Sequence, residues 1–277
     1  MIARFWGARG SIPTFSKETQ NFGGNTPCVT VVEKGQVLIL DAGSGIKRFG
    51  ESEMAKSFSE FHILLTHMHL DHIQGLGFFG PLYNPNCTVH IYGPAQSPEV
   101  LFGELSKYLS PPLFPVRIRD FAASLKFYGL PASRLQVGPF SIDSAYVIHP
   151  GPTLGYRICT SQGVVTYIPD HEMALGAHQF PREPEWTSGY ALAKDADLLI
   201  HDAQYTPEEY NLRKGWGHSS IEHTLQFGDL VKVKRLALFH HDPIHSDHFL
   251  QDMYLKHAHN RWPFHVIVSK EGDSIEI

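Results

Sequence analysis

Short apolar runs alternate with Gly, Pro, Asn or Asp turns along most of the chain. Runs rich in Val, Ile, Phe and Tyr that end at such turns are typical of β-strands. The pattern therefore predicts short strands over residues 1–6, 28–33, 36–40, 61–66, 88–92, 140–148, 154–159, 163–168, 197–201, 235–240 and 264–268.

Helical spacing of apolar residues marks three further segments, and it predicts helices over 98–109, 219–231 and 246–259. The second of these opens with Ser219-x-x-Glu222, which has the spacing of a capping box, and either Ser219 or Ser220 is expected to cap the helix. The segments around Pro111-Pro112 and 181–189 are predicted to be surface excursions. Many strands, helices between them and no linker predict one α/β domain over 1–277 that contains two sheets.

Composition narrows the function classes. The chain has 277 residues, of which 42% are hydrophobic and 18% charged, as in ordinary globular proteins. Its formal net charge of −5 disfavours a protein that coats nucleic acid. The short apolar runs predict no membrane span, and the N-terminus lacks a secretory pattern. Cys28, Cys87 and Cys159 lack C-x-x-C spacing, so we expect packing residues and a cytoplasmic protein.

Histidine is the unusual residue: there are 18, against 23 Lys plus Arg. Residues 66–72 read THMHLDH and directly follow the apolar run 61–65. Because residues two apart on a strand share a face, we expect His67 and His69 to point at one ion. After a turn, Asp71 and His72 would reach a second ion beside it. Neutral imidazoles and carboxylates are ligands for divalent zinc, manganese or iron.

The order H-x-H-x-D-H resembles the signature of the metallo-β-lactamase fold superfamily. The segments 23–28 (GGNTPC) and 41–45 (DAGSG) resemble the early strand and turn pattern of its phosphodiesterase branch. The resemblance implies a four-layer αββα sandwich. It also implies that the metals lie at the edge between the two sheets.

Three more residues match ligands of that superfamily, each after an apolar run: His149, Asp170 and His240. The resemblance implies one metal held by His67, His69, His149 and Asp170, and another held by Asp71, His72, Asp170 and His240. His241 follows His240, and motif alignment favours His240 as the ligand.

The surroundings of Asp170 depart from the family pattern. Pro169 and His171 stand where the family usually has Gly and Thr. His171 is therefore a candidate for a contact with the metal ligands without being a ligand itself. The pair His201-Asp202 ends another predicted strand, and the sequence leaves it as either a similar contact or a structural feature.

Two neighbouring divalent ions suit hydrolysis, because they lower the pKa of a bound water and neutralise an oxyanion. Zinc is the expected metal, with manganese or iron as alternatives. Gly217-His218-Ser219-Ser220 resembles the His-Ser/Thr motif of RNase Z-type tRNA endonucleases and phosphoribosyl cyclic phosphodiesterases. We therefore expect Asp71 and His218 to be catalytic, with a hydroxide between the metals as nucleophile and His218 as acid.

The same motif predicts substrate contacts by His218, Ser219 and Ser220. It precedes a predicted helix start, where free N–H groups favour an anion. We expect that helix end to lower the pKa of His218 in the free protein, and a bound anionic substrate to raise it again. Residues 96–120 are predicted to cover the metal site and to offer Phe102, Tyr108 and Phe114 for stacking a base or sugar.

A small cyclic or nucleotide-type phosphodiester is the favoured substrate. The chain shows no long, basic, Gly-rich arm for RNA, and residues 5–13 (FWGARGSIP) resemble the cyclic phosphodiesterases. The alternatives are an RNase Z-like endoribonuclease acting on RNA and a thioesterase or lactonase of the same fold. A non-catalytic metal-binding protein would be expected to have lost a ligand, and all seven positions are filled. A homodimer is one alternative for the assembly.

Overall fold

Within the described residues, two seven-stranded sheets form the centre of the molecule. The computed structural model describes residues 1–173, 180–181, 183–257 and 261–277. The first sheet has the order β14-β1-β2-β3-β4-β5-β6. Its strands are β1 (Ile2–Gly7), β2 (Cys28–Glu33), β3 (Gln36–Leu40), β4 (Glu60–Leu64), β5 (Thr88–Gly93), β6 (Ser124–Gly129) and β14 (Ser274–Glu276).

The second sheet has the order β13-β12-β11-β10-β9-β8-β7. Its strands are β7 (Arg134–Val137), β8 (Phe140–Tyr146), β9 (Leu154–Cys159), β10 (Val164–Ile168), β11 (Leu198–Asp202), β12 (Arg235–Phe239) and β13 (His265–Val268). In each sheet four neighbouring strands are parallel, β3 to β6 and β10 to β13. The carboxyl ends of each parallel set lie along one edge of its sheet, where ligands of α/β proteins commonly bind.

The central strands of both sheets are mostly apolar on both faces because both faces are covered. Ile39 and Ile63 are fully buried on the outer face of the first sheet, beneath the helices. Leu40 and Leu64 are fully buried on the opposite face, in a core that also contains Tyr167 of β10. The two sheets therefore share one hydrophobic core, and each is packed against helices on its outer side.

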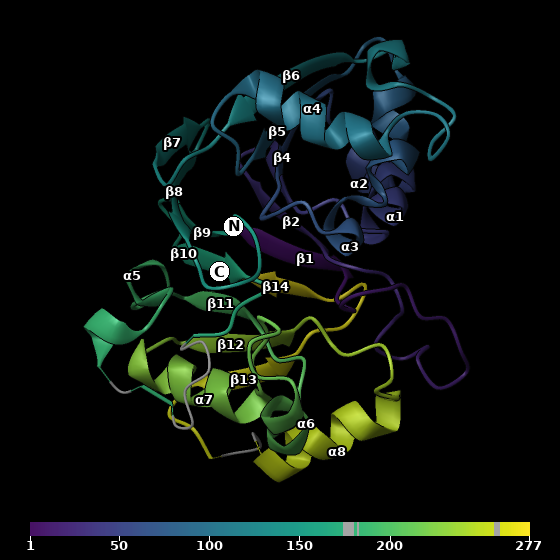
Figure 1. Ribbon diagram of the computed structural model, residues 1–277. Coiled ribbons are helices and arrows are strands. Elements are labelled where there is room, and N and C mark those ends of the chain that lie inside the picture. The colour runs from purple at the N-terminus through teal and green to yellow at the C-terminus, as the bar shows by residue number, and fades with distance from the viewer. Residues whose placement is uncertain (174–179, 182, 258–260) are drawn as a thin grey trace.

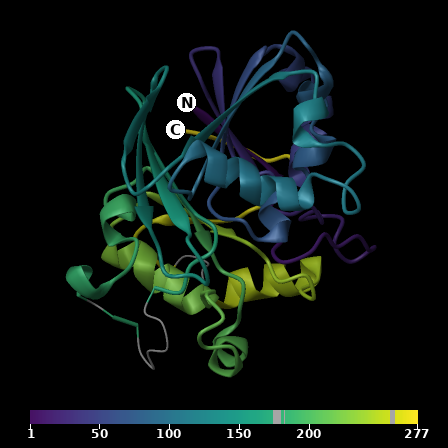
Figure 2. The same ribbon diagram turned by 45° about the horizontal axis from the view of Figure 1, so that its top comes forward.

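Helices form the two outer layers (Figure 1). α1 (Gly45–Glu51), α2 (Glu53–Lys56) and α4 (Pro98–Tyr108) lie on the side of the first sheet, and the one-turn α3 (Leu70–Ile73) follows β4. The helices on the side of the second sheet are α5 (Tyr190–Ala193), α6 (Pro207–Leu212), α7 (Ile221–Leu230) and α8 (Asp247–His257). Figure 2 shows the same layers from a second direction. The expected αββα sandwich is confirmed.

Each predicted strand and helix is present, and the boundaries agree to within two residues, although residues 258–259 of the last predicted helix lie outside the described residues. The elements that the pattern did not predict are short: β6, β7, β14, α1, α2, α3, α5 and α6. Segments of three to seven residues carry too few positions to show a period. Among the described residues, no helix combines the length and apolar character that a membrane crossing requires.

Candidate metal centre

The THMHLDH segment forms a loop and one helical turn at the end of β4. β4 ends at Leu64, so His67 and His69 lie in the loop rather than on a strand, and the predicted reason for their shared direction is wrong. The loop nevertheless brings their rings together, with centroids 4.4 Å apart. His69 is the N-cap residue of α3, whose first turn carries Asp71 and His72.

The first group of ligand atoms comes from both sheets. His67, His69, His149 and Asp170 each offer one such atom, and these atoms lie within 4.8 Å of one another. His149 Nε2 lies 3.1 Å from His69 Nδ1 and 3.6 Å from Asp170 Oδ2. His67 Nε2 lies 3.7 Å from the same carboxylate oxygen. All four therefore converge on one small volume beside Asp170 Oδ2.

The second group lies on the other side of Asp170. His72 Nε2 and His240 Nε2 are 3.0 and 3.3 Å from Asp170 Oδ1, and 3.4 Å from each other. Asp71 Oδ2 is 3.2 Å from His240 Nε2 and 3.5 Å from His72 Nε2. Asp170 thus turns one oxygen to each group, which is the arrangement expected of a carboxylate shared by two ions.

These spacings fit divalent cations. Zinc ligands lie about 2.0–2.2 Å from the ion, which places neighbouring tetrahedral ligands about 3.3–3.6 Å apart. His67 Nε2 and Asp170 Oδ1 are among the buried side-chain atoms that lack a hydrogen-bond partner in the described part of the chain. Such atoms are costly to bury unless a ligand satisfies them. The donor set and its geometry therefore fit two metal ions.

Electrostatics point the same way. Burial, with a smaller effect of His72, holds the pKa of His67 well below its usual value, so this imidazole is neutral and able to bind a cation. Burial opposes protonation of His72 as well, but Asp170, Asp71 and Asp41 outweigh it and raise its pKa. The carboxylates around His72 thus favour a positive charge, which a divalent ion supplies.

The second nitrogen of each of three ligand imidazoles is held by a partner outside the group. Nδ1 of His72 lies 2.8 Å from Asp41 Oδ2, and Nδ1 of His149 lies 2.7 Å from the carbonyl oxygen of Gly217. Nδ1 of His240 lies 3.0 Å from Gln204 Oε1. These contacts fix the rings so that Nε2 faces the site. The sequence indicated no role for Asp41 beyond its motif and contained no sign of Gln204. Each of these residues lies far along the chain from the histidine that it orients.

His218 lies between the two sheets beside both groups. Its ring centroid is 5.0 Å from those of His149 and His240. Its Nδ1 is 2.8 Å from Asp202 Oδ2, at the end of β11, and 3.9 Å from Asp170 Oδ2. Asp202 is thus the partner of His218, a role that the sequence left open.

The predicted lowering of the His218 pKa in the free protein is wrong. Burial lowers the pKa, but the buried carboxylate of Asp202, with Asp170 and Asp71 behind it, more than compensates and raises it to about 9. The cause is the direct ion pair with Asp202, which a sequence-local argument about a helix end does not contain.

All of these residues fall inside a known family. The family described as "Beta-lactamase superfamily domain" matches residues 40–241, a range that includes every proposed ligand and His218. The chain belongs to this superfamily. The predicted resemblance to the metallo-β-lactamase fold and to its phosphodiesterase branch is confirmed.

Three similar proteins illustrate the branch. A protein named Ribonuclease Z from Thermococcus gammatolerans is 26% identical, with 85% of this chain and 82% of that protein covered. The metallo-β-lactamase fold protein YhfI from Bacillus subtilis is 19% identical with a TM-score of 0.71, over 100% of this chain and 98% of its own. A diphosphatase of the PhnP family is 17% identical with a TM-score of 0.70, over 100% and 97%.

In this superfamily member, the loop before α7 is built around Glu172. Its carboxylate accepts hydrogen bonds from the backbone N–H groups of Gly215 and Gly217. Gly217 has φ +89°, and a Cβ there would meet the His149 ring at 2.5 Å and Pro150 at 2.2 Å. Only glycine fits at position 217. The close approach of this loop places the Gly217 carbonyl oxygen against His149 and brings the next residue, His218, to the ligand groups.

Ser219 and Ser220 do not present their hydroxyl groups as predicted. Both residues are buried; Ser219 Oγ donates to the His171 carbonyl oxygen, and Ser220 Oγ accepts from the His223 N–H as N-cap of α7. Of the two serines expected to cap the helix, Ser220 is the N-cap, and the spacing from Ser219 to Glu222 does not form a capping box. The Ile221 N–H is also taken, by the carbonyl oxygen of Tyr205. The polar groups at the start of α7 are thus occupied by hydrogen bonds within the protein. Of the three predicted substrate contacts, His218 remains the candidate.

The remaining histidines near the centre face away from it. His241 Nε2 lies 2.9 Å from the Ser269 carbonyl oxygen, so the structure places His240, and not His241, at the ligand group. His171 Nδ1 lies 2.9 Å from His201 Nε2, and both are fully buried. The backbone N–H of His171 donates to Asp202 Oδ2. His171 therefore supports the partner of His218 and does not touch the ligands themselves.

A cavity of about 430 Å³ opens beside the first ligand group. The start of α4 lines this cavity, so part of the predicted 96–120 segment lies beside the metal site. The aromatic residues predicted to stack a base or sugar do not line the cavity: Phe102 packs on Phe127, and Phe114 is buried against Phe78 and Tyr108. The cavity is lined instead by His67, Met68, His69, Pro94, Ala95, Gln96, Val100, Glu104, Pro150, Gly151 and Pro152.

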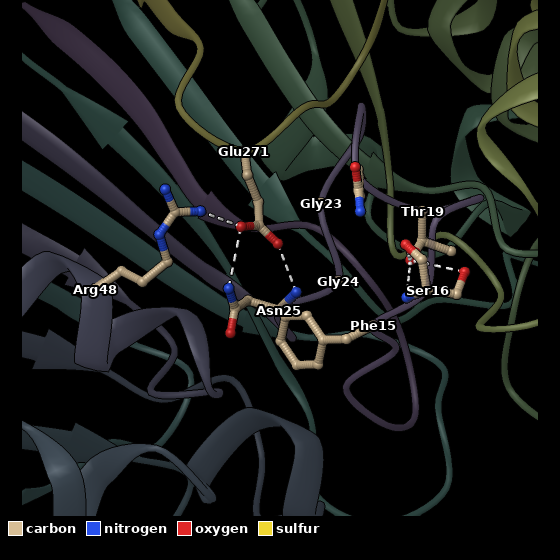
Figure 3. Close-up of a pocket in the computed structure, with 9 residues that line it drawn as sticks. Phe15, Ser16, Thr19, Gly23, Gly24, Asn25, Arg48 and Glu271 are labelled. Carbon is tan, nitrogen blue, oxygen red and sulfur yellow. Dashed lines mark hydrogen bonds and ion pairs between the residues drawn. The ribbon is translucent and has the colours of Figure 1, made fainter.

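A different cavity, of about 510 Å³, lies under the loop between β1 and β2 (Figure 3). The Glu271 side chain lies on its wall, where it accepts from the backbone and side-chain nitrogens of Asn25 and pairs with Arg48. This carboxylate is already neutralised and engaged by two residues. We therefore place the chemistry at the cavity that contains His67 and His69.

Proposed function

We propose that this protein hydrolyses phosphodiester bonds with the help of two divalent metal ions, zinc being the preferred metal. The observation that carries the proposal is the shared carboxylate of Asp170, which faces three imidazoles on one side and two imidazoles with a second carboxylate on the other. His67, His69, His149 and Asp170 would hold one ion. Asp71, His72, His240 and Asp170 would hold the other.

The ions, when bound, would lower the pKa of a water molecule and neutralise charge on the phosphoryl oxygens. The residues of the chain would position the metal ligands and protonate the leaving oxygen. The backbone N–H of Ser11 donates to Asp71 Oδ2 over 2.8 Å and holds that carboxylate in place. Asp41, Gln204 and the Gly217 carbonyl hold three of the ligand rings in the same way.

His218 is the proposed general acid. Its Nδ1 is engaged by Asp202, so its Nε2 is the nitrogen available to a substrate. The Asp202 carboxylate raises the pKa of the ring, which favours the protonated form that a general acid needs. In the reaction a water molecule releases one proton to solvent, its oxygen bonds to phosphorus, and the bond from phosphorus to the leaving oxygen breaks. The leaving oxygen takes the proton from His218, and solvent later restores it.

A small cyclic or nucleotide-type diester is the proposed substrate. The cavity next to the ligands has about 430 Å³, within the range that holds small molecules. Its walls combine apolar Val100, Pro150 and Pro152 with the acidic Glu104. A carboxylate can accept hydrogen bonds from sugar hydroxyls, and it repels further phosphate groups of a polynucleotide.

RNA is the second candidate. Its support is the similarity to the Thermococcus protein named Ribonuclease Z, which extends over 85% of this chain. On this alternative, the same centre would cut an RNA diester whose flanking nucleotides lie outside the cavity.

A substrate panel separates the candidates. Zinc- or manganese-loaded protein would be assayed on cyclic nucleotides, cyclic phosphoribose, dinucleotides, bis(p-nitrophenyl) phosphate, a thioester and precursor tRNA, with and without chelator. We expect chelator-sensitive turnover of the small diesters. Precursor tRNA cleavage without small-diester turnover would replace the small substrate by RNA. Thioester hydrolysis alone would overturn the phosphodiesterase proposal.

A further inference from the structure

A second cluster of metal-binding side chains lies at the other end of β4. Glu60 and His62 are two residues apart on this strand, so they share a face. His62 is the register partner of His90 on the neighbouring parallel strand β5. The three side chains therefore stand together on one face of a sheet, while His67 and the centre described above follow the opposite end of the strand.

The ligand atoms of this cluster are spaced as a bound ion requires. Glu60 Oε1 is 2.8 Å from His90 Nε2 and 3.8 Å from His62 Nε2. These two distances bracket the roughly 3.4 Å that separates neighbouring ligands around tetrahedral zinc. The longer one exceeds hydrogen-bond length, so a direct bond does not account for the approach of His62 to the carboxylate. One ligand atom from each of the three residues lies within 4.8 Å of the others.

Two tyrosines hold the far side of the imidazoles. His62 Nδ1 is 3.2 Å from the Tyr92 hydroxyl, and His90 Nδ1 is 3.0 Å from the Tyr128 hydroxyl. Without a cation, Nε2 of His90 is hydrogen-bonded to Glu60 Oε1 over 2.8 Å. When Nδ1–H of each imidazole donates to its tyrosine oxygen instead, the lone pair of Nε2 is directed at Glu60, and a cation between them would replace that hydrogen bond. The rings of His62 and His90 are also stacked, with centroids 4.4 Å apart, which limits their rotation. Such outside contacts are typical of histidine metal ligands.

Burial and access suit a cation that enters from solvent. Burial, together with His90 and against the pull of Glu60, lowers the pKa of His62 to about 4. This imidazole is therefore neutral at pH 7. The Glu60 side chain is 60% exposed, whereas those of His62 and His90 are 13% and 9% exposed. The carboxylate thus stands at the open mouth of a site whose two imidazoles are fixed on rigid strands.

We propose that Glu60, His62 and His90 form an accessory site for one divalent transition-metal ion of the zinc class. Two imidazoles and one carboxylate favour zinc, copper or nickel over magnesium and calcium, which prefer oxygen ligands. A water molecule would complete the coordination on the exposed side. Because its ligands come from β4 and β5, the ion joins two neighbouring strands and stabilises this part of the first sheet.

The test is a count of zinc ions per folded chain. Wild-type protein and the variants His90→Gln, His62→Gln and Glu60→Gln would be dialysed against the same saturating free zinc and measured by elemental analysis and calorimetric titration. We expect each histidine variant to bind one zinc fewer than wild type, and Glu60→Gln to bind that zinc about tenfold more weakly or worse. The thermal stabilisation by this last zinc should vanish with it.

His248→Gln is the matched control, because His248 is an exposed imidazole 3.0 Å from Asp252. It should keep the wild-type zinc count. Equal counts in wild type and the His62 and His90 variants would overturn the site, as would equal affinity in Glu60→Gln, whose exposed side chain makes misfolding an inadequate explanation. The result does not depend on the proposed function, because the zinc count needs no substrate, and the accessory-site variants should keep diester hydrolysis since they leave the Asp170 centre and His218 intact.

Discussion

His218 depends on Asp202 for its orientation and its charge. The 2.8 Å contact between His218 Nδ1 and Asp202 Oδ2 connects the loop before α7 to the end of β11. We expect His218→Ala to keep both metals and lose roughly 10²–10⁴-fold in kcat on diesters with poor leaving groups. Asp202→Asn should lose about 10–100-fold.

Leaving-group dependence distinguishes this role from a structural one. p-Nitrophenolate needs little protonation, so both variants should lose much less on bis(p-nitrophenyl) phosphate than on an alkyl diester. Rates for the two substrates and metal content would be measured on the same preparations. Equal losses on both substrates would argue against a general acid, and loss of metal from His218→Ala would make His218 a ligand.

Asp170 is the residue on which both ions depend. Its Oδ1 faces His72 and His240, and its Oδ2 faces His67 and His149. Asp170→Ala should therefore reduce occupancy of both positions and abolish diester hydrolysis. Elemental analysis after zinc dialysis checks this, with Asp143→Ala as control, because the half-buried Asp143 of β8 pairs with Arg134 and not with a ligand residue. Full retention of one ion by Asp170→Ala would refute the bridging role.

At the scale of elements, the start of α4 borders the cavity next to the ligands. Val100 lines that cavity, whereas Phe102 packs on Phe127. We expect Val100→Arg to raise KM for a cyclic nucleotide about tenfold, which corresponds to roughly 1.4 kcal/mol of lost binding. Its effect on bis(p-nitrophenyl) phosphate should be smaller. Phe102→Ala should leave both KM values near wild type. A larger rise in KM for the cyclic nucleotide in Phe102→Ala than in Val100→Arg would show that the substrate does not bind against Val100.

Asp197 connects three elements of the second sheet. Its carboxylate accepts from the Val164 N–H at 2.7 Å and pairs with Lys234 at 2.6 Å. Partial burial raises its pKa, but the Lys234 bond and the Val164 N–H outweigh this and hold it below the usual 3.8. A lowered folded-state pKa stabilises the fold above that usual value and loses its effect as pH falls below it.

Asp197→Asn should accordingly lower Tm by a few degrees at pH 7, and the difference from wild type should shrink below about pH 4. Thermal unfolding between pH 3 and 8 would show this. Asp252→Asn, on the exposed face of α8, is the control. A difference that is constant across the whole range would mean that charge on Asp197 is not the cause.

At the scale of the whole molecule, charge should separate the two candidate substrates. The chain carries a formal net charge of −5, and a diester with one negative charge releases few counterions on binding. KM for a small diester should change less than about fourfold between 50 and 200 mM salt, whereas six to ten phosphate contacts would cost about 10³–10⁵ in affinity. Steep salt dependence together with efficient precursor tRNA cleavage would favour RNA.

The sequence alone predicted the strands and a two-sheet α/β domain, and the resemblance of its motifs to a known superfamily implied the sandwich and the ligand residues. Apolar runs fix strands locally, and a polar residue such as Asp170 or His240 at the end of a run marks where its strand leaves the core. His67, His69, Asp71 and His72 lie within six consecutive residues, so this group could also be recognised from the sequence. In the structure a loop and a helical turn bring these residues together. These features could be recognised because they depend on neighbours in the chain.

Only the tertiary structure decided which side chains meet across strands. Asp202 reaches His218, Asp41 reaches His72, and Gln204 reaches His240 because sheet register and loop closure align residues distant in sequence. The same holds for His62 and His90, which belong to different strands and become neighbours through the pairing of β4 with β5. Burial and charge at such contacts reverse local expectations. The raised pKa of His218 follows from a carboxylate 16 positions away in the sequence and 2.8 Å away in space.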